Sequence, residues 1–273
     1  MNLFDKIELP DVKRILAVAS GKGGVGKSMI AANLAVALSR QGLNIALVDA
    51  DIFGPSIPKM FGLETAKPEM TTVDGKNMLL PMEKHGIKIM SIGFLVESDR
   101  GLIWRGPLAA KAITQLFEDT LWGKVDYMII DFPPGTSDIQ LTTVQKLVVT
   151  GALIVTTPQE MSLSDARKAA SMFTNPDLKT PILGVVENMS WFTPANHPDE
   201  KYFIFGQGGG SRLAKEYNTR LLGQIPLIAE VGEAADQGKS IYSLNNTTAM
   251  EAFDEMVEQL TKSSGLNFTD VSS

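Results

Sequence analysis

The sequence predicts an α/β fold in three layers, with helices on both faces of a mostly parallel sheet. The first observation is that short β-rich runs alternate with segments of helical length. The second is that these runs are apolar almost throughout, which is typical of strands buried on both faces. The expected strands are Ile15–Ser20, Asn44–Ala50, Val125–Asp131, Ala152–Thr157 and Ile182–Asn188, and the expected helices are Lys27–Gln41, Pro107–Leu121, Asp138–Val149 and Ser162–Phe173.

The length of the chain favours one large domain or at most two. It has 273 residues, of which 44% are hydrophobic and 21% are charged, as in ordinary globular proteins. We expect a single domain over residues 1–262, followed by a weakly ordered polar tail over 263–273.

A glycine-rich loop follows the first expected strand. Residues Gly21–Ser28 read GKGGVGKS, which satisfies the pattern G-x-x-x-x-G-K-[ST] between a strand and a helix. Glycines let successive backbone N–H groups turn toward one phosphate, and the helix N-terminus adds its positive dipole end. The motif therefore predicts a three-layer P-loop NTPase. The expected backbone contacts to phosphate come from Gly23, Gly24, Val25, Gly26 and Met29.

Three polar side chains of this loop have expected roles. Lys27 neutralises the β- and γ-phosphates of ATP, and Ser28 offers its hydroxyl to Mg²⁺. Lys22 is an additional lysine that an ordinary phosphate loop does not need. It is either a solvated surface lysine or a second phosphate contact, which can reach a neighbouring subunit.

Aspartates end the second and third expected strands. Asp49-Ala50-Asp51 closes the second strand, and Asp131 closes the third. Because carboxylates at strand ends orient metal-bound water and the attacking water, we expect Asp131 in the outer Mg²⁺ shell and Asp51 beside the water. Gly135, after two prolines, is expected to bring its N–H to the γ-phosphate. Each aspartate taken alone is also compatible with a helix cap or a turn.

Two segments interrupt the alternation of strands and helices. Thr71–Gly93 is expected to be a hairpin-like excursion with Asp74-Gly75 as its turn. Ser190–Gly210 is expected to be a loop-rich insertion, because it contains prolines and a glycine triplet. We expect neither segment to form a separate domain.

Composition excludes several function classes. The formal net charge of −6 argues against a surface that binds nucleic acid or anionic lipid by charge alone. Apolar runs fall short of the ~20 residues of a membrane helix, and the N-terminal segment lacks the apolar core of a signal peptide. We therefore expect a cytoplasmic protein without a nucleic-acid or membrane partner. The chain has no cysteine, which excludes disulfides, a cysteine nucleophile and iron–sulfur clusters held by its own thiolates.

The quoted loop, with its early lysine, resembles the deviant phosphate loop of the ParA/MinD class of dimeric ATPases. Other segments are similar to the Mrp/ApbC family of iron–sulfur cluster carriers within that class. They are Asp49–Pro58, Trp104-Arg105-Gly106-Pro107, Asp131–Thr142, Thr156–Glu160, Asp165–Ala169, Glu187–Ser190, Ile204–Gly206 and Leu222–Pro226. The similarity runs from about residue 11 to about residue 245.

The resemblance implies a homodimer that binds Mg-ATP at a shared face, hydrolyses it slowly and passes clusters between assembly partners and apoproteins. It implies that Lys22 crosses to the partner's nucleotide and that Asp51 is catalytic and orients metal-bound water. It places Asp49 with Asp131 in the outer metal shell. It further implies that Asn188 and the loop at Pro226 frame the adenine.

The chain departs from that family in three places. The segment that carries the family's paired cysteines continues here as Trp191–His197 without a thiol, so a cluster of the family type cannot form by that route. His197, Asp199 and Glu200 can offer nitrogen and oxygen ligands to iron, or are simply solvated, or the loop docks a partner that brings cysteines.

Met29 stands where the family has a hydroxyl residue, which predicts one lost hydrogen bond worth ~0.5–1.5 kcal/mol. About fourteen residues precede the first strand, where many bacterial members carry a small extra domain, so we expect a short form or a truncated chain.

Two other functions stay open at this point. One is a nucleotide-gated scaffold whose hydrolysis is negligible. The other is a MinD/ParA-like positioning ATPase acting on membrane or nucleoid, which the acidic character of Ala249–Lys262 disfavours.

Overall fold

The computed structural model describes residues 6–95, 106–244 and 246–263. Their main feature is an eight-stranded sheet with the order β10-β9-β8-β1-β7-β2-β6-β5. All neighbouring strands in it are parallel except the edge pair β5–β6. The strands are β1 (Val12–Ser20), β2 (Ile45–Asp49), β5 (Met82–Lys84), β6 (Ile87–Ser91), β7 (Val125–Asp131), β8 (Gly151–Thr156), β9 (Ile182–Phe192) and β10 (Leu221–Leu227).

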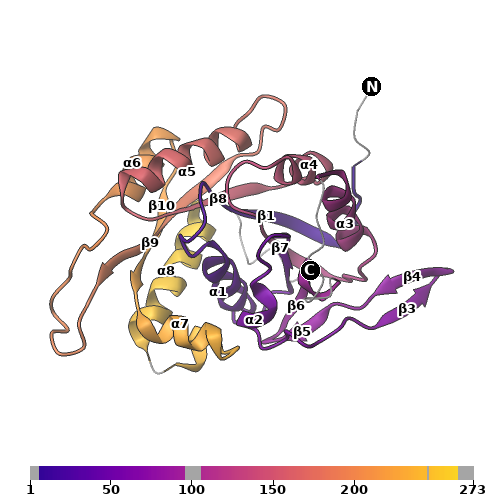
Figure 1. Ribbon diagram of the computed structural model, residues 1–273, viewed down its shortest axis with the longest axis horizontal. Coiled ribbons are helices and arrows are strands. Elements are labelled where there is room, and N and C mark those ends of the chain that lie inside the picture. Colours follow the sequence, from indigo (N-terminus) through magenta and orange to yellow (C-terminus); the bar gives the residue numbers. More distant parts are fainter. Residues whose placement is uncertain (1–5, 96–105, 245, 264–273) are drawn as a thin grey trace.

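The helices lie on both faces of this sheet (Figure 1). One face carries α1 (Lys27–Ser39), α2 (Ile57–Met60), α7 (Ala229–Asp236) and α8 (Thr247–Ser263). The other carries α3 (Gly106–Glu118), α4 (Asp138–Lys146), α5 (Glu160–Phe173) and α6 (Gly209–Glu216). Two short 3₁₀ helices, Ile92–Phe94 and Ile241–Ser243, complete the elements. The predicted three-layer α/β fold is confirmed.

The centre of the sheet is the most deeply buried part of the described chain. Every residue of β2, β7 and β8 is buried, and these strands flank β1 directly or through one neighbour. Burial on both faces explains why their sequences are apolar throughout rather than alternating. The loops that follow these strands therefore start from well-packed strand ends.

The segment that we expected to be an excursion has two parts. β3 (Met70–Val73) and β4 (Lys76–Leu79) form the expected hairpin, a separate two-stranded sheet that projects from the molecule (Figure 1). Asp74 and Gly75 form its turn with φ of 51° and 79°. The rest of the segment, β5 and β6, belongs to the main sheet, because the buried run Ile87–Ser91 pairs with β2.

The second interruption is also shorter than expected. β9 continues to Phe192, and α6 begins at Gly209, so both ends of the expected insertion belong to regular elements. The strand β10 was not among the strands that we expected. Of the predicted tail over 263–273, Ser263 ends α8 and residues 264–273 lie outside the described residues, as does the Trp104-Arg105 motif. In the described part of the chain, no helix is both long and apolar enough to cross a membrane.

Candidate functional site

The phosphate loop leaves β1 at the carboxyl edge of the sheet, where β1 lies between β8 and β7. Gly24 and Gly26 have φ of 79° and 80°, a left-handed conformation that glycine adopts without strain. Gly21 packs so closely on α5 that a Cβ there would lie 1.9 Å from the carbonyl carbon of Asp165. These glycines are therefore required by the path of the loop, and α1 begins directly after it at Lys27.

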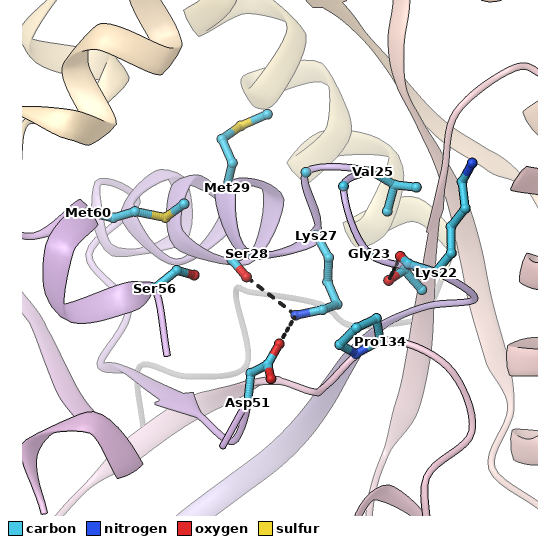
Figure 2. Close-up of a pocket in the computed structure, with 13 residues that line it drawn as sticks. Lys22, Gly23, Val25, Lys27, Ser28, Met29, Asp51, Ser56, Met60 and Pro134 are labelled. Atoms are coloured by element: carbon cyan, nitrogen blue, oxygen red, sulfur yellow. Dashed lines mark hydrogen bonds and ion pairs between the residues drawn. The ribbon is translucent and has the colours of Figure 1, made fainter. Parts of the chain in front are cut away.

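A pocket of about 250 Å³ opens in front of this loop (Figure 2). Its lining contains the expected phosphate-binding residues and Asp51, together with four residues that we did not predict. The complete lining is Ser20, Lys22, Gly23, Gly24, Val25, Gly26, Lys27, Ser28, Met29, Asp51, Ser56, Met60 and Pro134. The structure thus brings two expected groups, the loop and the acid after β2, into one cavity.

The ammonium group of Lys27 lies at the floor of this pocket. Its Nζ donates a hydrogen bond to Asp131 Oδ1 at 2.5 Å and to Ser28 Oγ at 3.3 Å. It also lies 3.9 Å from Asp51 Oδ2. The side chain of Lys27 is only 6% exposed, so these carboxylates supply the charge compensation that a buried ammonium needs.

Two carboxylate oxygens beside Lys27 are buried and accept no hydrogen bond: Asp51 Oδ1 and Asp131 Oδ2. Burial raises the pKa of Asp131, and the Lys27 ammonium opposes that rise. Unsatisfied buried oxygens are costly unless something else binds them. Together with the Ser28 hydroxyl, these oxygens are the hard donors that Mg²⁺ and its bound waters prefer, so the residues present fit this ion.

Asp49 is arranged differently from the other two acids. It is fully buried, its Oδ1 accepts the N–H of Asp51, and its Oδ2 accepts the N–H of Ile57 and the hydroxyl of Ser91, each at 3.1 Å. Burial, followed by the nearby carboxylate of Asp131, raises the pKa of Asp49, and the N–H groups of Asp51 and Ile57 oppose that rise. Both of its oxygens thus accept hydrogen bonds within the protein, and its outer metal-shell role stays a prediction.

Gly135 lies at the edge of the site, and its backbone N–H already donates a hydrogen bond within the protein. Its φ is 86°, and its N–H donates to the carbonyl of Ser20 at 2.8 Å. The expected contact of this N–H with a γ-phosphate therefore requires that bond to break. The residue that lines the pocket from this segment is Pro134.

The two residues expected at the adenine are not in the phosphate pocket. Asn188 is buried behind the loop, where its Nδ2 donates to the carbonyl of Val25 at 2.8 Å. Pro226 lines a second, apolar cavity of about 350 Å³ with Trp191, Phe192 and Leu227. The two cavities share no lining residue. The adenine contacts of Asn188 and Pro226 remain a prediction.

Lys22 lines the phosphate pocket but is not directed into it. The side chain is half-buried, and Figure 2 shows its ammonium pointing away from Lys27. The Lys22 ammonium is therefore better placed to contact a group outside the phosphate pocket than to reach the floor of the pocket near Lys27.

The residues considered for iron in the 190–210 segment do not converge. His197 Nδ1 lies 3.4 Å from Glu200 Oε1, and both side chains are exposed. Over residues 6–95, 106–244 and 246–263, no group of three or more histidine, aspartate or glutamate side chains is placed to hold a metal ion.

Sequence reasoning missed Ser20, Ser56, Met60 and Pro134 in the pocket lining. Ser56 and Met60 come from the loop after β2 and from α2, a helix of only four residues. The one signal that pointed to Ser56 was its position in Asp49–Pro58, shortly after the acids. A phosphate motif identifies its own loop but not the loops that fold over it.

The fold and the phosphate pocket together define a P-loop NTPase. A family model described as ParA, NUBPL iron-transfer P-loop NTPase, matches residues 11–261. The chain belongs to this family, in its Mrp/ApbC branch of iron–sulfur cluster carriers.

Individual relatives agree with this assignment. An iron-sulfur cluster carrier protein of Aquifex aeolicus is 48% identical over 240 residues, covering 88% of this chain and 64% of the relative. The Escherichia coli K12 protein of the same description is 50% identical over 227 residues, covering 83% of this chain and 60% of the relative. The chain thus spans just under two thirds of the length of these relatives.

A solved structure matches as well. A nucleotide-binding protein from Archaeoglobus fulgidus in complex with ADP has a TM-score of 0.73 and 38% identity, covering 86% of this chain and 90% of that one.

Proposed function

We propose that this chain is an Mg²⁺-dependent ATPase that binds ATP at the phosphate loop and hydrolyses it. The observation that supports this most strongly is the pocket in front of Gly21–Ser28. Its lining includes the buried ammonium of Lys27 and Asp51, and Asp51 and Asp131 beside that ammonium each keep one carboxylate oxygen without a partner in the protein. The related Archaeoglobus protein was solved with ADP.

Each polar group of the pocket has a role in this proposal. The loop amides and Lys27 bind the β- and γ-phosphates, and Ser28 with the free oxygens of Asp51 and Asp131 holds Mg²⁺ and its waters. The ion, when bound, neutralises charge on the phosphate oxygens. Asp51, which is the acid that lines the pocket, orients the attacking water.

We propose that the active form is a homodimer joined across the phosphate face. The outward direction of the Lys22 ammonium supports a contact with a partner subunit. Phe53 and Met161 add apolar surface at the same edge, since they are 70% and 78% exposed at the carboxyl ends of β2 and β8. Exposed apolar side chains of this size favour an interaction surface.

We propose further that ATP turnover in this chain acts on a partner protein that supplies its own thiolates. The relatives are described as iron-sulfur cluster carriers, but this chain has no cysteine with which to hold a cluster. Assembly proteins or apoproteins with cysteine ligands are therefore the expected partners, and the cluster is their cargo.

Single-turnover hydrolysis tests the enzyme proposal against the nucleotide-gated scaffold. Asp51→Asn should slow phosphate formation about 100-fold or more, because a positioned carboxylate contributes a factor of that order, while ATP still binds. Asp119→Asn is the matched control, because its exposed pair with Lys76 is remote from the pocket. Equal rates for Asp51→Asn and the wild type would contradict the role of Asp51, and no turnover in any of them would favour the scaffold.

A further inference from the structure

The contacts of Asp49 connect the two ends of one loop. Asp49 ends β2, in register with Asp131 on β7 and with Ser91 on β6. Its Oδ1 accepts the N–H of Asp51, at the start of the loop, and its Oδ2 accepts the N–H of Ile57, at the end. A single buried carboxylate therefore accepts hydrogen bonds from both ends of the segment 50–57.

This loop carries two of the side chains that line the phosphate pocket, Asp51 and Ser56. Inside it, the N–H of Gly54 donates to the carbonyl of Asp51 at 3.3 Å, and that of Ile52 donates to Ala50 at 3.1 Å. These bonds are local to the loop and do not fix it to the sheet. At its first residue the loop is also bound to β7, because the N–H of Ala50 donates to the carbonyl of Asp131 at 2.9 Å. Beyond Ala50, the Asp49 carboxylate joins the loop to the end of β2.

Ser91 supports the carboxylate from the neighbouring strand. Its hydroxyl donates to Asp49 Oδ2 at 3.1 Å and accepts the N–H of Gly93 at 3.0 Å. Gly93 in turn packs against the loop, since a Cβ on it would lie 3.0 Å from the Cβ of Pro55. Ser91 at the end of β6 therefore contacts the Asp49 carboxylate, and Gly93 in the 3₁₀ helix that follows contacts the loop that this carboxylate holds.

The other two acids of the site leave an oxygen free, whereas Asp49 does not. Asp51 Oδ1 and Asp131 Oδ2 are buried without a partner, but each oxygen of Asp49 accepts at least one hydrogen bond from the loop or from β6. A carboxylate engaged in this way has little capacity left for metal-bound water. The difference separates Asp49 from Asp51, which lines the pocket, and from Asp131, which binds Lys27.

We infer that Asp49 is a positioning residue for hydrolysis, not part of the metal shell. It holds the loop so that the Asp51 carboxylate and the Ser56 hydroxyl stay in the pocket, and Ser91 fixes the orientation of its carboxylate. This role rests on the proposed ATPase function. It acts through backbone amides that hold Asp51 in place, so its loss lowers the turnover rate and affects Mg²⁺ binding only as far as Asp51 is displaced.

The test compares Asp49→Asn and Ser91→Ala with the wild type in two measurements. Asp49→Asn puts an amide NH₂ where a backbone N–H or the Ser91 hydroxyl donates, so kcat should fall about 10- to 100-fold, as for a displaced catalytic group. Ser91→Ala removes one hydrogen bond, and kcat should fall about 2- to 10-fold. The Mg²⁺ concentration for half-maximal rate should rise no more in either variant than it does in Asp51→Asn.

Amide hydrogen exchange without nucleotide is the second measurement. The amides of Asp51 and Ile57 should exchange faster in Asp49→Asn and, to a smaller extent, in Ser91→Ala. Thr120→Ala is the control, since it removes a buried hydroxyl hydrogen bond to Leu116 far from the loop and should leave these amides unchanged. If Asp49→Asn does not fold, Ser91→Ala alone decides the outcome.

A rise in the Mg²⁺ requirement 10- to 100-fold beyond that of Asp51→Asn would overturn the inference, because that is the effect of losing a further outer-shell metal group. Unchanged exchange at Asp51 and Ile57 would overturn it as well. If the wild type does not hydrolyse ATP, the proposed function fails, while the exchange result still decides whether Asp49 holds the loop.

Discussion

Lys27 shows how one residue serves both stability and binding in this site. Its buried ammonium is held by Asp131, with Asp51 nearby, in a position from which it can also reach a phosphate. The loop motif predicts the lysine and its neighbours, because the whole pattern is local in sequence. The motif does not predict the other residues that line the pocket, Ser56, Met60 and Pro134. Their positions depend on how distant segments of the chain fold together.

Replacement of Lys27 should destabilise the protein in a pH-dependent way. Lys27→Met leaves the fully buried Asp131 without its counter-charge, which costs about 3–5 kcal/mol near neutral pH. Without Lys27, burial raises the pKa of Asp131 further, so the folded state binds a proton that the unfolded state releases. Stability of the variant should therefore fall as pH rises above about 4, relative to the wild type.

Urea unfolding of Lys27→Met and the wild type between pH 4 and pH 8 checks this sign. A difference in unfolding free energy that is constant across the range would contradict the proposed burial of an unpaired carboxylate.

Met29 offers a second test at the scale of one residue. It lines the pocket where the family has a hydroxyl residue. Met29→Thr should restore a hydrogen bond worth ~0.5–1.5 kcal/mol and lower the Kd for ATP by about 2- to 10-fold. Titration calorimetry measures this directly, and an unchanged or weaker Kd would mean that the side chain at this position does not face the nucleotide.

At the scale of elements, the apolar strands and the helices next to them were predictable, whereas β6 and the strands β5 and β10 at the two edges of the main sheet were not. The strands β1, β2, β7, β8 and β9 match expected runs, because burial on both faces leaves an unambiguous apolar signal. The strand β6 was missed because five residues next to a hairpin turn, four of them buried, look like part of the hairpin. The turn itself was predicted from Asp74-Gly75, which adopts the expected positive φ.

The contact between the phosphate loop and α5 gives a prediction at this scale. Gly21→Ala would place a Cβ 1.9–2.3 Å from backbone atoms of Asp165 and Ala166, so the loop must move away from α5. Nucleotide affinity should fall at least 10-fold, and stability should fall as it does for other overpacked sites, by about 1–3 kcal/mol.

Gly232→Ala is the control for this change. It lies in α7 with nothing within 4 Å of its Cβ position, and it should stabilise the protein by about 0.5–1 kcal/mol. Wild-type affinity in Gly21→Ala would show that the loop does not depend on α5 for its position.

At the scale of the whole molecule, the sequence predicts the class of fold but not the order of the strands. Alternating strands and helices imply parallel pairing, yet the placement of β1 between β8 and β7 follows from packing that no local pattern records. This order brings the loop after β1, the acid after β7 and the loop after β2 to one edge of the sheet. The acids and the phosphate loop are distant in sequence and meet only there.

The homodimer is the prediction that belongs to this scale. With Mg-ATP, Asp51→Asn should sediment as a dimer, because ATP persists when hydrolysis is slowed. The added substitution Lys22→Ala should weaken that dimer at least 10-fold if its ammonium contacts the partner's nucleotide. Sedimentation velocity checks both statements, and equal dimer formation with and without Lys22 would contradict the contact across the interface.

Binding of Mg-ADP measured by titration calorimetry tests the central claim most directly. We predict saturable one-site binding per chain by the folded wild type, and at least 100-fold weaker binding by a folded Lys27→Ala variant. The absence of measurable binding by wild-type protein whose circular dichroism shows a folded α/β domain would contradict the assignment of this pocket to a nucleotide.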